Sequence, residues 1–247
     1  MDRLGYDASL NTANLAVMLR HLPLLVAVTP LVGVTVAFWI SAGRGLIPSC
    51  MPLLEGCTSI SATGRYEPAS WIFRAVQLPL ASLLFVTWLL SIQWLKAMHH
   101  DNRAVQRTIL IAGTVGAVAL IVYVSFLGTQ QPFYEFMRRF GIYFYFGGTG
   151  VAQVALALAL ARVDQFAVRF DRHRPSTTLL WLAALPWALG VLNLILKNTL
   201  EDADAMENRI EWIAALLMQL YWLFLWFAWR ATGFEIRART DVRPPGG

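Results

Sequence analysis

The chain alternates between long apolar runs and short polar connections. Each run is long enough to cross the hydrocarbon core of a bilayer, about 30 Å thick, as a helix of about 20 residues. Strands of outer-membrane barrels are about 10 residues long and alternate between apolar and polar positions, which these runs do not. The pattern therefore predicts an all-α polytopic membrane protein, a bundle of six transmembrane helices. The predicted spans are Leu22–Ile40, Trp71–Leu95, Ile109–Leu127, Gly141–Ala161, Leu179–Leu196 and Ile210–Trp229.

Composition and charge agree with this pattern. Hydrophobic residues make up 57% of the chain and charged residues only 14%, whereas about 25% of a soluble domain is charged. Thirteen of the 20 Lys and Arg residues fall on the side of the two termini and seven on the other side. By the positive-inside rule, both the N and the C terminus are predicted to be cytoplasmic. The net charge of +5 is thus interpreted as topology, and no nucleic-acid partner is expected.

The predicted domain organisation is simple. Residues 1–235 form a single six-helix membrane domain with a long outer loop, 41–70, and residues 236–247 form a Pro- and Gly-rich cytoplasmic tail that we expect to be disordered. The first span is too long for a signal peptide that is removed, so it is interpreted as retained. The sequence leaves open a bacterial inner membrane, a eukaryotic endomembrane or a plasma membrane.

Both cysteines of the chain lie in the outer loop. Cys50 and Cys57 are predicted to be outside, where a disulfide can persist, and a bridge is sterically possible if their Cα atoms come within about 7 Å. Alternatively, Cys57 is a small buried residue.

Polar side chains gather at the outer ends of the spans. Ionisable groups near a span are costly, and they usually face a bundle interior or a cavity. We therefore expect a polar pocket in the outer leaflet, where Arg and Lys suit a membrane lipid with an anionic or phosphate-containing headgroup. Alternatively, the long cationic side chains only reach the interface as anchors. The candidate residues are Arg74, Arg138, Arg139, Asn193, Lys197, Asn208 and Glu211.

Glu211 is the candidate for chemistry, because it lies one helical turn inside the sixth span. The alternative is that a carboxylate at a helix start only complements the helix dipole. Signatures of serine hydrolases, zinc proteases and phosphate-binding loops are missing from the sequence. The four histidines lie at or beyond cytoplasmic span ends. We therefore expect no metal and no cofactor.

The loop carries a motif with a known resemblance. The stretch from Ile60 to Phe73 reads I-S-A-T-G-R-Y-E-P-A-S-W-I-F. It resembles the signature I-S-x-x-G-x-x-x-P-x-x-x-I-F of the DRAM/Frag/Sfk family of six-span membrane proteins, which includes autophagy modulators and a factor that remodels the lipid of GPI anchors. The pair Glu211-Trp212 and the stretch Phe136–Gly141 resemble the starts of that family's last and fourth spans. The chain departs from the family at Thr58, the position of a Pro in many members, and at Arg138 and Arg139, where many have a His.

The resemblance implies a protein that remodels a membrane lipid on the outer or lumenal side. The loop would then fold over the pocket as a lid, with a φ > 0 turn at Gly64 and re-entry at Pro68. Ser59, Ser61, Arg65 and Trp212 would join the lipid-binding residues, and Glu211 would act as orienter or base. Alternatively, the loop is a structural plug whose serines only satisfy backbone groups.

Two classes of function follow. The first is a protein that binds or remodels a membrane lipid, similar to GPI-anchor lipid-remodelling factors. The second is a non-enzymatic membrane sensor, scaffold or channel component. Whether the protein is an enzyme stays open at this stage.

Overall fold

The computed structural model describes residues 19–129, 131–163 and 175–236. All but the first residue of the predicted tail, 236–247, lie outside these ranges, so the tail stays a prediction.

Six helices in these ranges are long and apolar enough to cross a membrane, which confirms the prediction of an all-α six-span bundle. Three helices begin six to nine residues before their predicted spans, because the apolar run marks only the part in hydrocarbon. The helix of the fourth span begins at Pro132, a residue suited to a first turn, and so includes Arg138 and Arg139. The helices are α2 (Leu22–Gly43), α5 (Ala69–Ala97), α6 (Arg103–Ser125), α7 (Pro132–Leu160), α9 (Pro175–Thr199) and α10 (Asp204–Thr232).

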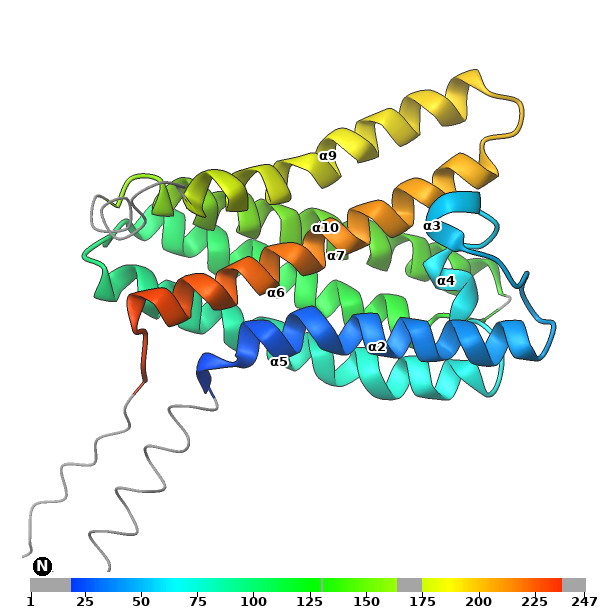
Figure 1. The fold of residues 1–247 in the computed structure, drawn as a ribbon, viewed down its shortest axis with the longest axis horizontal. Helices are drawn as coiled ribbons and strands as arrows, with labels where there is room; N and C mark the ends of the chain where they lie inside the picture. The colour runs from blue at the N-terminus through cyan, green and yellow to red at the C-terminus, as the bar shows by residue number, and fades with distance from the viewer. Residues whose placement is uncertain (1–18, 130, 164–174, 237–247) are drawn as a thin grey trace, which may run out of the picture.

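The six helices form a closed ring (Figure 1). Each packs against its neighbours in the sequence, and α10 closes the ring by packing against α2. The start of α2 and the end of α10 lie at the same end of the bundle. A hydrogen bond from the indole N–H of Trp226 to His21 Nδ1, at 3.1 Å, joins them. Which side of the membrane this end faces stays a prediction.

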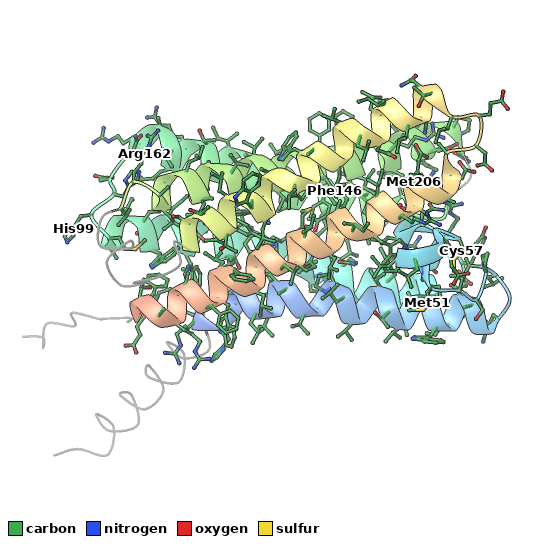
Figure 2. All side chains as sticks on the ribbon, turned by 45° about the horizontal axis from the view of Figure 1, so that its top comes forward. Met51, Cys57, His99, Phe146, Arg162 and Met206 are labelled. Atoms are coloured by element: carbon green, nitrogen blue, oxygen red, sulfur yellow. A yellow bond between two sulfur atoms is a disulfide. The ribbon has the colours of Figure 1, made fainter. Side chains whose placement is uncertain are left out.

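The loop predicted as 41–70 contains two short helices, α3 (Pro52–Glu55) and α4 (Ile60–Thr63). Both contact α10, and α4 also contacts α2. Figure 2 shows Met51 and Cys57 of this loop at one end of the bundle, near Met206, with His99 and Arg162 at the other end. We call the end with Cys57 the disulfide end.

Glycines set the closest approach in the ring, between α6 and α7. A Cβ on Gly148 would lie 2.6 Å from the carbonyl oxygen of Ala112 and 2.8 Å from the backbone N of Gly116, and a Cβ on Gly141 would lie 2.6 Å from the backbone N of Tyr123. Such small-residue contacts let helices pack by van der Waals contact in lipid, where the hydrophobic effect gives no driving force between helices.

Adjacent glycines of α7 offer a matched test of this packing. Gly148→Ala should lower the free energy of unfolding by about 1–3 kcal/mol, because the added Cβ meets backbone atoms that cannot move away cheaply. Gly147→Ala adds the same group where no atom lies within 4 Å, so it should be neutral or stabilising by up to about 1 kcal/mol. Thermal unfolding of the two variants in detergent measures the difference, and equal melting temperatures would contradict the packing role.

Candidate functional site

The loop between α2 and α5 is closed by a disulfide. Cys50 and Cys57 are bonded, with their Cα atoms 6.6 Å apart, and α3 lies between them. The helix α3 ends at Gly56, whose φ of +68° is in the left-handed region. A Cβ at Gly56 would also collide with the backbone of Ala205, lying 3.0 Å from its Cα. The loop therefore rests directly on the start of α10.

The first turns of α10 hold this loop by hydrogen bonds. Asn208 Nδ2 donates to the carbonyl of Gly56 at 2.8 Å, and the indole N–H of Trp212 donates to the carbonyl of Thr58 at 2.9 Å. Residues 208 and 212 lie on one face because they are four positions apart in a helix. Sequence analysis predicted Asn208 and Trp212 as lipid-binding residues; the side-chain N–H groups of both are occupied by the loop.

Glu211 takes part in the same anchoring. Its carboxylate accepts hydrogen bonds from the backbone N–H groups of Ile60 and Ser61. The side chain is half-buried, and among the described residues it has no cation within ion-pair distance. Glu211 therefore anchors the loop, and its side chain also lines the two cavities described below.

The serines of the I-S-x-x-G motif have structural partners. Ser59 caps α4, its Oγ accepting from the backbone N–H of Ala62 at 3.1 Å, and Ser61 Oγ pairs with the Tyr123 hydroxyl at 2.9 Å. Nearby, Ser41 Oγ donates to the carbonyl of Thr63 at 2.8 Å. These contacts favour the structural interpretation of the serines over a nucleophilic one.

The expected φ > 0 turn at Gly64 is wrong. Its φ is −102°, which any residue can adopt. A glycine is needed there for a different reason, because a Cβ would lie 2.8 Å from Cβ of Phe73 and still closer to its ring. Pro68 directly precedes α5, as expected for the re-entry into the second span.

A cavity of about 790 Å³ lies between α7, α9 and α10 below α4. It brings together seven of the residues predicted from the sequence. These are Ser59, Ser61, Arg139, Asn193, Lys197, Asn208 and Glu211.

The mouth of this cavity at the disulfide end is charged. Lys197 on α9 and Glu207 on α10 form an ion pair at 3.1 Å, with 63% and 25% of their side-chain surface exposed. Arg139 on α7 pairs at 2.6 Å with Glu135 of its own helix. We call Arg139, Lys197 and Glu207 the charged rim. Helical spacing places Glu207 one turn before Glu211 on the same face, but Glu207 was not among the predicted site residues.

Away from the rim the cavity is mainly apolar. Its wall includes Ile142, Phe146, Leu194, Ala214 and Met218, and three glycines, 147, 150 and 190, widen it. Gln153 lies at the far end, buried, and both atoms of its amide group lack a hydrogen-bond partner. At about 1.5 Å of rise per residue, Arg139 and Gln153 lie about 21 Å apart along the axis of α7.

The remaining predicted residues do not line this cavity. Arg74 donates from Nη2 to the carbonyl of Leu127 at 2.6 Å, tying α5 to the end of α6. Arg138 forms an ion pair with Glu135 at 3.5 Å, and the backbone of Arg65 packs against Gly128. Trp212 lines a second, smaller cavity.

The second cavity, of about 210 Å³, lies on the other side of Glu211. Its polar wall residues include Gln77, Tyr123 and Gln219, and Glu211 lines both cavities. Most of the other wall residues of the second cavity are apolar. The Glu211 side chain thus stands in the wall between a large amphipathic cavity and a smaller, mainly apolar one.

Within the described ranges, no three His, Cys, Asp or Glu side chains gather as a metal site. Comparisons of the chain with protein-family models, with curated proteins and with solved structures found no match.

Two glycines with the same backbone angle test how the loop is anchored. Gly56→Ala should detach the loop from α10, because it adds a collision with Ala205 to the cost of a positive φ, about 1 kcal/mol or more. Gly45 has the same φ of +68° but no neighbour within 4 Å of its Cβ position, so Gly45→Ala carries only the backbone cost. Hydrogen–deuterium exchange should accelerate across residues 52–63 in the first variant alone. Equal exchange in the two variants would mean that the contact with α10 does not hold the loop.

Proposed function

We propose that this integral membrane protein binds a membrane lipid in the cavity between α7, α9 and α10. The headgroup would lie at the charged rim and an acyl chain would extend into the apolar part. The observation that carries this proposal is the division of one cavity into a charged mouth and a long apolar interior. The positive-inside rule puts the rim at the outer leaflet.

The dimensions support a lipid. Pockets for small molecules usually measure about 300–1,000 Å³, and 790 Å³ lies in the upper part of that range. The distance of about 21 Å from Arg139 to Gln153 along α7 exceeds half of the hydrocarbon core, about 15 Å. A chain from one leaflet can therefore lie along the cavity.

Access from the bilayer also supports a lipid. Only 17% of the most apolar window of α9 is buried inside the bundle, against 33% or more for the other spans. In Figure 1 α9 runs along one edge of the bundle. Val191 and Leu194 of α9 line the cavity and are also exposed at the surface. A lipid could enter sideways past α9 without crossing water.

The rim offers partners for a phosphate. Arg139 presents a planar guanidinium that can bind two oxygens, and Lys197 presents a compact ammonium. Arg139 is paired with Glu135 at an exposed site, where an ion pair contributes only about 0–1 kcal/mol. A phosphate could therefore bind this guanidinium at little cost, whereas Lys197 is paired with the less exposed Glu207.

A bulky residue at Gly190 tests binding directly. Gly190 lines the cavity, and its Cβ position has no atom within 4 Å. Gly190→Phe should therefore fill the cavity without disturbing helix packing, and should lower the amount of co-purifying phospholipid about tenfold, or about 1.4 kcal/mol. Native mass spectrometry of the protein in mild detergent measures the bound lipid.

Gly43→Phe is the matched control, because that position is equally open but lines neither cavity. Its bound lipid should equal that of the unsubstituted protein. If Gly190→Phe binds as much lipid as the unsubstituted protein, the lipid lies on the outer surface of the bundle and the cavity is not its site.

We further propose that the protein remodels the bound lipid, because the loop motif resembles that of the DRAM/Frag/Sfk family. Glu211 is the residue we propose as base, because it is a carboxylate that lines the lipid cavity and, among the described residues, has no cation within ion-pair distance. The serines are not proposed as nucleophiles, since the described part of the chain places no histidine beside them.

Glu211→Gln separates binding from chemistry. The variant should still bind lipid in the cavity, because the apolar interior and the cations of the rim are unchanged, while any release of fatty acid or lysolipid from liposomes should fall about 10²–10⁴-fold, the usual contribution of a general base. Glu201→Gln, an exposed carboxylate outside both cavities, is the control. Retained turnover in Glu211→Gln would exclude the base. No turnover in the unsubstituted protein would leave a lipid-binding sensor or scaffold.

A further inference from the structure

The charges around the large cavity balance. Four charged side chains line it, the cations Arg139 and Lys197 and the carboxylates Glu207 and Glu211. A site built for an anionic lipid would carry an excess of positive charge. An equal number of each sign suits a headgroup that is itself neutral but carries both charges.

The ion pair across the mouth of the cavity also suits a headgroup that carries both charges. Lys197 and Glu207 join α9 to α10 at 3.1 Å, and Glu207 is the less exposed partner. A phosphate that took Lys197 alone would leave the Glu207 carboxylate without a partner and next to a like charge, which is unfavourable. A headgroup that brings an ammonium together with its phosphate leaves both residues paired.

Glu211 supplies a second carboxylate at the same place. It follows Glu207 by four positions, so the two side chains share a face of α10, and both line the cavity. The backbone N–H groups of Ile60 and Ser61 occupy only part of its acceptor capacity, since a carboxylate has about four lone-pair sites.

We propose that the bound lipid is a zwitterionic phospholipid with a primary amine, that is, a phosphoethanolamine headgroup. The phosphate binds Arg139 and Lys197, and the ammonium binds Glu207 and Glu211. This inference rests on the lipid-binding function proposed above and assigns the headgroup to it.

The residues at the rim favour a primary amine over choline. A primary ammonium has three N–H donors for carboxylate acceptors, whereas a quaternary ammonium has none and is bound over aromatic faces. Among the described residues, three aromatic side chains line the cavity. Tyr143 lies one turn from Arg139 and is a single ring, not the aromatic cage that binds quaternary ammonium groups, and Phe146 and Trp187 lie deeper than the rim. Measured along their helices, they are about 10 Å and 15 Å from Arg139 and Lys197, respectively.

Three lipids with identical dioleoyl chains test the headgroup. The delipidated protein in neutral detergent is titrated with phosphatidylethanolamine, phosphatidylcholine and phosphatidylglycerol, and bound lipid is counted by native mass spectrometry. Phosphatidylethanolamine should bind about tenfold more tightly than either of the others, a difference of about 1.4 kcal/mol. Glu207→Gln should weaken its binding about tenfold and strengthen that of phosphatidylglycerol, because the repelling carboxylate is gone. Glu201→Gln should change neither.

The outcomes separate the two proposals. If no phospholipid binds the unsubstituted protein, the proposed function fails. If phosphatidylglycerol binds as well as phosphatidylethanolamine, lipid binding stands and the headgroup assignment is wrong; equal binding of phosphatidylcholine overturns the primary amine. A change of preference in Glu207→Gln cannot come from loss of folding, which would weaken all lipids together. If that variant does not fold, Glu211→Gln should show the same loss of preference for phosphatidylethanolamine.

Discussion

The need to satisfy backbone polar groups near lipid governs the disulfide end of this bundle. Irregular backbone is tolerated at membrane depth only where protein or water supplies its hydrogen bonds. Here Asn208 and Trp212 of α10 bind carbonyls of the loop between α2 and α5, and Arg74 of α5 binds the carbonyl of Leu127. Glu211 accepts from the opposite kind of group, the N–H of Ile60 and Ser61. These bonds keep the loop folded over the helix ends.

The same constraint explains why polar side chains gather there without all serving one site. Some bind backbone carbonyls, as Arg74 binds that of Leu127 and Trp212 that of Thr58, and others remain around the cavity, as Lys197 and Arg139 do. Glu211 belongs to both groups, because it anchors the loop and faces both cavities. A substitution of Glu211 therefore changes both the anchoring of the loop and the wall of the cavities.

The cavity exists because the ring of helices is packed unevenly. Between α6 and α7, Gly116, Gly141 and Gly148 bring backbones into contact. On the other side of α7, Gly147 meets no neighbour, and across the cavity Gly190 of α9 meets none either. Glycine thus produces close packing on one face of α7 and open space on another. The loosely packed α9 then leaves the cavity accessible from the bilayer, which is what a lipid ligand requires.

The sequence by itself determined the six spans and the end of the bundle where polar groups gather, because apolar length and polar cost are properties of local composition. It predicted Lys197, Asn193 and Glu211 at the cavity for the same reason.

The sequence did not distinguish these residues from Arg74, because the partner of Arg74, the Leu127 carbonyl, lies far away in the chain. Glu207 was missed because only the folded α9 brings Lys197 to it. Gly64 was assigned to a turn, whereas its real constraint is the ring of Phe73. Which polar group faces a cavity and which satisfies the backbone was decided only by the tertiary structure, since that choice depends on partners that packing brings together.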